Sequence, residues 1–204
     1  MYFVHLETKE VETLLKKITV LVLVFMLTVS SLALAGDLGQ QQIESAQKLV
    51  AMGILTGYED GSLKLENNIT RAEFAVLAVR LLSKDKDIDK YKTDTKFSDV
   101  KKENWASGYV NIAVEEGLIT GYEDGTFKPQ KNISYAEILA VLVRLLGYDD
   151  TLDPNEKWPV NYLKKSTELG INKDMLIAAG SYATRGDVVL FVDRSLVIKL
   201  DREY

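Results

Sequence analysis

The sequence contains no cysteine, and its only histidine, His5, lies near the start of the chain. Without cysteine the protein has no disulfide bonds and no thiol nucleophile. Without histidine after residue 5 it has no His-dependent catalytic triad and no ordinary zinc site. The fold must therefore be stable through its hydrophobic core, and residues 36–204 are enough for one sizeable core.

The chain also lacks an excess of basic residues. It carries 25 Lys and Arg against 30 Asp and Glu, which gives a net charge of −5. Proteins that bind nucleic acid concentrate basic residues on one face, so we expect no nucleic-acid partner.

Residues 1–35 differ in character from the rest of the chain. The basic flank "LLKK" precedes an uninterrupted apolar run over 18–29 and the small residues "SSLALA". Ala33-Leu34-Ala35 fits the cleavage pattern of a secretory signal peptide. A retained membrane anchor is the alternative, although the apolar stretch is at the short limit for one. We expect 1–35 to be a signal peptide, no membrane span to be retained, and the cysteine-free protein to be exported into a Gram-positive type of envelope.

The remaining chain contains three copies of one unit. Residues 53–82 align without a gap to 117–146, and 16 of these 30 positions are identical. Residues 158–171 and 184–196 form a third, degenerate copy. They match 105–118 and 134–146 of the second copy, and the loop between them is three residues shorter. We place the copies at 44–82, 97–148 and 157–196, with a C-terminal tail at 197–204 and polar linkers at 83–96 and 148–157. Regular repetition of this kind is typical of repeat architectures.

Each copy has the pattern of a helix, a loop and a second helix. Val110, Ala113 and Val114 share one helical face, and Gly53, Gly117 and Gly170 each follow such a segment as helix-ending residues. The second helix of each copy is apolar nearly all round, which requires burial on most sides. We therefore predict an all-α fold, in which three helix-loop-helix repeats form an intramolecular pseudo-threefold bundle with the amphipathic helices outside.

The second helices begin with capping boxes. Thr70 and Glu73 form one, Ser134 and Glu137 repeat it, and Thr184 with Asp187 gives a shortened version. Arg71 follows Thr70, where its charge opposes the helix dipole.

Two interpretations of Arg71 remain open. It could bind a carboxylate ligand together with free amides at the helix start, or it could pair with a neighbouring Asp or Glu. On the first interpretation we expect Arg71→Ala to weaken ligand binding without lowering the melting temperature.

Taken together, these motifs resemble the S-layer homology family. The segment 97–134, which begins "FSDV", and "ITRAEF" in the first copy carry the resemblance, which extends over about 44–196. It implies a cell-wall module of the S-layer type, in which three tandem repeats bind a secondary cell-wall polysaccharide, often pyruvylated, in grooves between the repeats. It also implies a location in the bacterial cell wall and possible contacts with other envelope proteins.

The resemblance implies that Arg71 and Arg185 contact an anion, with Asp99, Trp105 and Trp158 as further groove residues. The first copy lacks "FSDV" and a Trp, the second has Tyr135 in place of the Arg, and the third has no clear "FSDV". No copy is complete.

From the residues alone, both Trp side chains could instead pack in the core. Arg80, Arg144 and Arg194, near the helix ends, are interpreted as structural.

Three functions remain to be compared. The first is non-covalent anchoring to the cell wall. The second is an assembly module that has kept the fold and lost polysaccharide binding. The third, a glycosidase that uses two carboxylates, is disfavoured because the acidic residues fit turns, caps and linkers. The "YEDG" loops do not supply the oxygen ligands of an EF-hand, so we expect no metal, no cofactor and no enzyme activity.

Overall fold

The computed structural model describes residues 16–20 and 37–201. The chain divides into one unit over 1–41 and a second over 42–204. Within the first unit, residues 16–20 and 37–41 are helical. Most of the predicted signal peptide lies outside the described residues. Within those ranges, no helix has both the length and the apolarity that crossing a bilayer requires.

The second unit is all-helical in its described part, as the sequence predicts. Residues 42–51 form the first helical stretch. The elements that follow are α2 (Arg71–Leu81), η1 (Asp85–Asp87), α3 (Ile88–Tyr91), α4 (Ser107–Glu115), α5 (Tyr135–Leu146), η2 (Asp149–Thr151), α6 (Val160–Glu168) and α7 (Arg185–Ser195). The linker at 83–96, which we expected to be only polar, contains η1 and α3. Ile88 lies against Gly108 of α4, where a Cβ atom would come within 2.9 Å of the Ile88 carbonyl oxygen.

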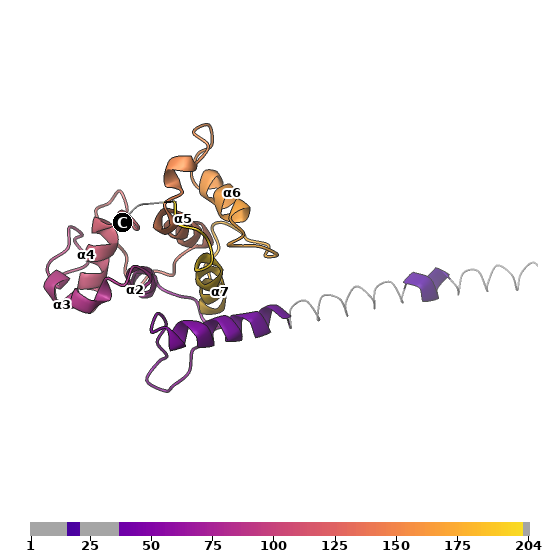
Figure 1. Ribbon diagram of the computed structural model, residues 1–204, viewed down its shortest axis with the longest axis horizontal. Coiled ribbons are helices and arrows are strands. Elements are labelled where there is room, and N and C mark those ends of the chain that lie inside the picture. The colour runs from indigo at the N-terminus through magenta and orange to yellow at the C-terminus, as the bar shows by residue number, and fades with distance from the viewer. Residues whose placement is uncertain (1–15, 21–36, 202–204) are drawn as a thin grey trace, which may run out of the picture. The chain divides into compact units, whose positions relative to one another are not determined.

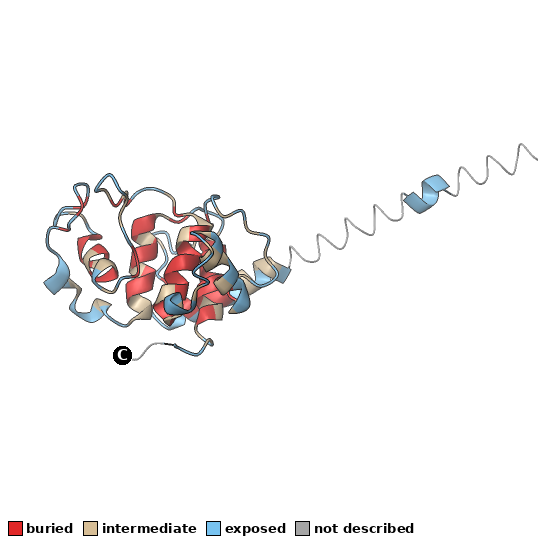
Figure 2. Cartoon of the chain, turned by 90° about the horizontal axis from the view of Figure 1, so that it is seen from above, coloured by how far each residue is buried: buried red, intermediate tan, exposed pale blue. Residues whose placement is uncertain are grey.

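The inner helices α2, α5 and α7 carry most of the core. Figure 1 shows them at the centre of the unit, and Figure 2 shows buried residues, coloured red, gathered in the helices there. Nine residues of α5 are buried, and Phe74, Phe127 and Phe191 are among the largest fully buried side chains. Helix α5 contacts both α2 and α7. The expectation that the apolar second helices bury one another is confirmed.

A ring of backbone hydrogen bonds joins the three copies. The amide of Ile133 donates to the carbonyl of Ile69 (3.0 Å), the amide of Ala183 to Ile133 (3.1 Å), and the amide of Ile69 to Ala183 (3.3 Å). These residues occupy the same position in each copy, immediately before the capping residue. The ring has the cyclic connectivity that a pseudo-threefold bundle requires, while the symmetry itself stays a prediction.

The outer helices pack against the inner helix of the preceding copy. Helix α4 of the second copy packs on α2 of the first, and α6 of the third packs on α5 of the second. The cycle closes at the first copy, where Ser45 donates to Asp193 of α7 (3.0 Å) and Lys48 pairs with the same carboxylate. Consequently, side chains from different copies meet at each boundary.

The helix ends match the sequence prediction. Both complete capping boxes are formed, and the Thr184 side chain accepts from the Asp187 amide in the shortened one. Gly53, Gly117 and Gly170 have φ values of +73°, +69° and +77°, the left-handed conformation that favours glycine at a helix end.

Gly121 provides a test of how the "FSDV" segment packs. A Cβ atom there would lie 2.1 Å from the Phe97 ring, whereas at the equivalent Gly57 the nearest atom is a carbonyl oxygen at 3.1 Å. Gly121→Ala should therefore lower the free energy of unfolding by about 1–3 kcal/mol, because the buried ring must shift. Urea denaturation should show a smaller loss for Gly57→Ala. Equal losses would contradict this packing.

Candidate functional site

Two grooves lie between the copies, and each contains one of the two Trp residues. The Trp158 groove has a volume of about 670 Å³ and is lined by Arg71, Ile119, Thr120, Gly121, Tyr122, Glu123, Asp124, Lys128, Ile133, Glu137, Ala140, Val141, Arg144 and Trp158. The Trp105 groove has a volume of about 280 Å³ and is lined by Leu55, Thr56, Gly57, Tyr58, Glu73, Val76, Leu77, Arg80, Trp105, Tyr109 and Arg185. Most lining positions of the two grooves correspond in the repeat alignment.

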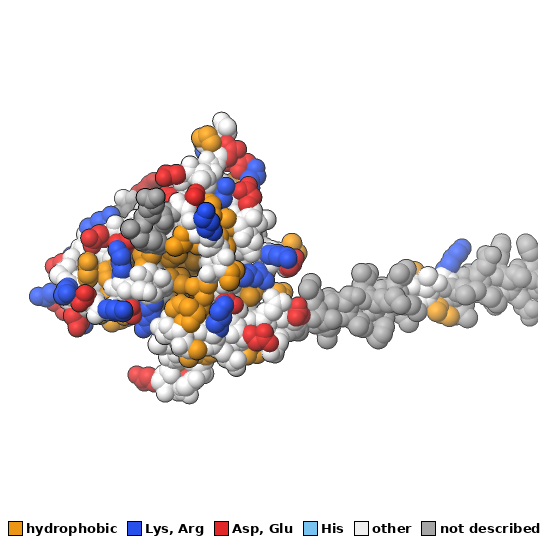
Figure 3. All heavy atoms as spheres, in the orientation of Figure 1, with side chains coloured by type: hydrophobic (Ala, Val, Ile, Leu, Met, Phe, Trp, Pro, Cys, Tyr) orange, Lys and Arg blue, Asp and Glu red, His pale blue; other side chains and the backbone are white. Residues whose placement is uncertain are grey.

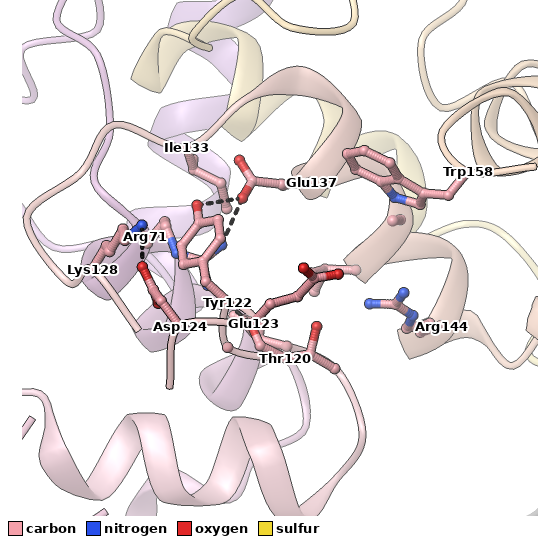
Figure 4. A pocket seen from close by; sticks show the side chains of 14 residues that line it. Arg71, Thr120, Tyr122, Glu123, Asp124, Lys128, Ile133, Glu137, Arg144 and Trp158 are labelled. Carbon is pink, nitrogen blue, oxygen red and sulfur yellow. Dashed lines mark hydrogen bonds and ion pairs between the residues drawn. The ribbon is translucent and has the colours of Figure 1, made fainter. Parts of the chain in front are cut away.

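Arg71 forms one wall of the Trp158 groove (Figure 4). It is 3% exposed, and its guanidinium reaches into the second copy. Nε donates to the Phe127 carbonyl (2.8 Å), one terminal nitrogen to Glu137 Oε1 (2.7 Å) and the other to the Thr120 carbonyl (3.0 Å). The guanidinium also lies over the Tyr122 ring, 4.6 Å from its centroid. These contacts correspond to the second interpretation, in which the arginine pairs with a neighbouring acid.

Arg185 occupies the corresponding place in the Trp105 groove. It is 5% exposed and donates to the carbonyls of Leu63 (3.0 Å) and Thr56 (3.3 Å). Its closest approach to Glu73 is 3.8 Å, longer than the 2.7 Å between Arg71 and Glu137. The two grooves therefore share one design but differ in how tightly the arginine is held.

The capping-box glutamates also belong to the grooves. Glu137 accepts from the Ser134 amide (2.9 Å), the Tyr122 hydroxyl (2.9 Å) and Arg71. Burial raises the pKa of Glu137, but the hydrogen bonds from Ser134 and the charge of Arg71 outweigh it and hold the pKa below its usual value. In the other groove, burial and a hydrogen bond to Glu73 raise the pKa of Tyr58.

One part of the carboxylate-site hypothesis is wrong. We expected free amides at the start of the second helices, but the neighbouring copy uses them. The amide of Arg71 donates to the Lys131 carbonyl (2.9 Å) and that of Ala72 to Pro129 (3.0 Å). The Thr70 hydroxyl oxygen accepts from the Glu73 amide, so the first turn of α2 offers no free amide to a ligand.

The two Trp residues are exposed at the groove edges. Trp105 is 51% exposed and Trp158 is 55% exposed, so neither packs in the core. Figure 4 shows Trp158 across the groove from Arg71. Each indole is presented to the groove of the preceding copy, because the outer helices pack against that copy.

Asp99 lies apart from both linings. Its carboxylate accepts from the amides of Phe127 (2.8 Å) and Lys128 (2.7 Å). It therefore holds in place the loop segment whose Phe127 carbonyl accepts from Arg71. The structure therefore joins Asp99 to the Trp158 groove through this loop.

Sequence reasoning missed several groove residues. From the sequence, Tyr58 and Tyr122 stand out only as part of the "YEDG" loops, although their hydroxyls donate to the capping-box glutamates. Arg80 and Arg144 were interpreted as structural, and they do donate to the carbonyls of Ile54 (3.2 Å) and Leu118 (3.1 Å), yet they also line the grooves. The tyrosine and the arginine each recur 64 residues apart, at the same position of the first two copies, and this recurrence is the sequence signal that could have identified them as groove residues.

The Trp158 groove contains a surface ion pair at its rim. The Lys128 ammonium lies 2.8 Å from Asp124, and together with the Thr126 hydroxyl and amide it holds the pKa of Asp124 at about 2. In the part of the chain that the structure describes, no cluster of three or more His, Cys, Asp or Glu could hold a metal ion.

Arg71→Ala should destabilise the fold. The substitution removes the cation that pairs with the half-buried Glu137 and leaves the Phe127 and Thr120 carbonyl oxygens without the Arg71 donor, which should lower the free energy of unfolding by about 2–3 kcal/mol. The melting temperature should therefore fall, contrary to the expectation from sequence alone. Lys86→Ala, at an exposed position, should change stability by less than about 0.5 kcal/mol. Equal melting temperatures for Arg71→Ala and wild type would contradict these contacts.

The lowered pKa of Glu137 predicts acid sensitivity. A carboxylate whose folded pKa lies below its unfolded value of about 4.3 stabilises the fold above that pH, and this stability is lost as the pH falls through the folded pKa. Chemical denaturation of the wild type should therefore show stability falling below about pH 4.3. Glu137→Gln should be less stable at pH 7 and lose less stability on acidification. Parallel pH profiles would argue against an ionised, stabilising Glu137.

Comparison with known proteins identifies related sequences. The chain is 34% identical over 157 residues to the Middle cell wall protein of Brevibacillus brevis, which covers 77% of this chain and 15% of that protein. It is 35% identical over 130 residues to a Surface layer protein of Brevibacillus choshinensis (64% and 12%). It is 41% identical over 156 residues to a Cellulosome-anchoring protein of Acetivibrio thermocellus (70% and 35%). The chain thus spans at most about a third of the length of these relatives.

The family comparison covers both better-preserved copies. The model of the S-layer homology domain matches residues 41–75 and 96–139, which include the "ITRAE" and "FSDV" segments and both "YEDG" loops. These matches, with the relatives above, show that the chain belongs to the S-layer homology domain family.

Proposed function

We propose that the chain anchors protein to the bacterial cell wall by binding a secondary cell-wall polysaccharide in the Trp158 and Trp105 grooves. The binding is non-covalent, and a pyruvylated amino-sugar is the unit that each groove accepts. The arrangement that supports this most directly is an exposed indole facing an arginine, a tyrosine and a glutamate from other copies, twice in one chain. Apolar sugar faces pack on indole rings, while the polar wall fixes orientation through hydrogen bonds.

The arginines retain donors for a ligand. Of the five N–H bonds of Arg71, three are used by Phe127, Glu137 and Thr120. The remaining two N–H bonds form no hydrogen bond with the described residues, and Arg71 is one of the residues that line the groove. A ligand carboxylate can accept from them, so Arg71 and Arg185 serve at once in the interface between copies and in binding.

The local charge of the grooves favours an anionic polymer despite the net charge of −5. The Trp105 groove is lined by Arg80 and Arg185 against the single carboxylate of Glu73. The Trp158 groove balances Arg71, Lys128 and Arg144 against Glu123, Asp124 and Glu137. Neither groove is therefore net negative, and an acidic saccharide is not repelled where it binds.

The groove carboxylates do not suit glycoside hydrolysis. A glycosidase needs one carboxylic acid with a raised pKa to protonate the leaving group. Here the pKa of Glu137 is lowered and that of Asp124 is about 2. The Trp105 groove has only one carboxylate. We propose a non-enzymatic module, located in the cell wall or S-layer, which holds envelope proteins at the surface; one relative is named a cellulosome-anchoring protein.

The Trp residues test this function because they are exposed. Trp105→Ala and Trp158→Ala should each weaken binding to isolated wall sacculi about 5- to 30-fold, a loss of about 1–2 kcal/mol, without lowering the melting temperature. Co-sedimentation measures the binding. Val197→Ala, which removes an 82% exposed apolar side chain elsewhere, is the matched control and should bind as wild type does.

The same assay separates anchoring from assembly. Sacculi stripped of their non-peptidoglycan polymer should no longer bind the chain. Binding that survives both stripping and the double substitution of Trp105 and Trp158 would refute polysaccharide binding and favour the assembly module.

A further inference from the structure

Viewed copy by copy, the motif losses in this chain look scattered. The first copy has no Trp, the second has Tyr135 instead of an arginine, and the third has a shortened loop without "YEDG" and Asp187 instead of a glutamate. Each copy has lost something different.

Each groove, however, takes its residues from three copies. The Trp158 groove uses Arg71 from the first copy, Tyr122 and Glu137 from the second, and Trp158 from the third. The Trp105 groove uses Arg185 from the third copy, Tyr58 and Glu73 from the first, and Trp105 from the second. Both sets are complete.

All the losses meet at the remaining boundary, which we call the Tyr135 interface. There the second copy supplies Tyr135 where the other boundaries have arginine, and the third copy supplies Asp187 and the shortened loop. The first copy supplies Gln42, whose side-chain amide donates to Asp187 Oδ1 (3.0 Å), from the helix that corresponds to α4 and α6, each of which follows a Trp in the other copies. No arginine and no indole belong to this set of contacts.

The Tyr135 interface is closed by its own hydrogen bonds. Asp187 is 8% exposed, and both carboxylate oxygens are used: Gln42 donates to one, while Tyr135 and Thr184 donate to the other. Burial and the bond to Asp187 raise the pKa of Tyr135, so the hydroxyl keeps its proton and remains a donor.

The backbone also leaves little space at this interface. A Cβ atom at Gly186 would lie 2.6 Å from the Gln42 amide oxygen, so the amide packs directly on the start of α7. A hollow beside the loop of the third copy includes neither Tyr135 nor Asp187. Its lining residues are Thr167, Gly170, Asn172, Lys173, Asp174, Met175 and Leu176.

We infer that this chain has two saccharide sites, and that the third boundary, the Tyr135 interface, is closed by its own hydrogen bonds and binds no ligand. The inference rests on the proposed function. It assigns a role to the degenerate third copy, which lacks a groove of its own but supplies Trp158 to one groove and Arg185 to the other. Both sites therefore depend on the third copy.

The two Trp residues allow each groove to be observed separately. The chain has only two Trp, one at each groove, so Trp105→Phe leaves Trp158 as the sole indole and Trp158→Phe leaves Trp105. The probe is one repeating unit of the non-peptidoglycan wall polymer, purified after acid release from sacculi. Each single-Trp variant should show a saturable fluorescence change, and calorimetry of the wild type should give two sites per chain.

Matched substitutions assign the sites. Arg71→Lys should abolish the response of Trp158 and spare that of Trp105, and Arg185→Lys should do the reverse. Tyr135→Phe should lower the melting temperature, because Asp187 loses a donor, and leave two sites per chain. One or three sites, or loss of a site in Tyr135→Phe, would overturn the inference.

The design distinguishes this failure from failure of the proposed function. A chain that binds sacculi but shows no response of either indole to the probe would refute the groove assignment and leave wall anchoring intact. A chain that does not bind sacculi would refute the proposed function itself.

Discussion

The structure depends on backbone hydrogen bonds that each copy makes with another. The first amides of an α-helix have no partner within the helix and must find acceptors elsewhere. In α2, α5 and α7 the first two amides donate to loop carbonyls of the neighbouring copy, and the ring through Ile69, Ile133 and Ala183 lies beside them. Each inner helix is therefore completed by another copy. This explains why the repeats form one unit. Its surface carries charged side chains of both signs (Figure 3).

These bonds also place the arginines. A cation at the first position of a helix opposes the dipole, but the neighbouring loop brings a carboxylate and carbonyl oxygens to meet it. For Arg71 these are Glu137, Phe127 and Thr120. Glu137 thus both caps its own helix and neutralises the arginine of the copy before. The groove is a consequence of the way in which the copies are joined.

Boundaries between copies take two forms in this chain, open and closed. With arginine, glutamate and an indole a boundary forms an open groove with exposed apolar and polar surface. With tyrosine, aspartate and Gln42 it is closed by neutral and charged hydrogen-bond partners. The backbone bonds at the helix start are kept in both cases, as the amide of Tyr135 donates to Ser181 (3.1 Å). The side chains at a boundary can therefore close a groove without breaking the ring of backbone hydrogen bonds.

The sequence by itself determined the repeats, the all-α class, the capping boxes and the helix-ending glycines, because these depend on local spacing and conformation. It also singled out Arg71, Arg185, Trp105 and Trp158, which recur or stand out in the alignment. It did not reveal that the helix-start amides are occupied, that Tyr122 and Arg144 line a groove, or that 83–96 contains helical turns.

Only the tertiary structure decided how residues of different copies combine. The outer helices pack on the preceding copy, so Arg71, Glu137 and Trp158 meet although each belongs to a different repeat. Reading each copy separately suggested that none was complete. Read by boundary, two are complete and one is closed, because a groove is a property of packing between copies and no single stretch of sequence contains it.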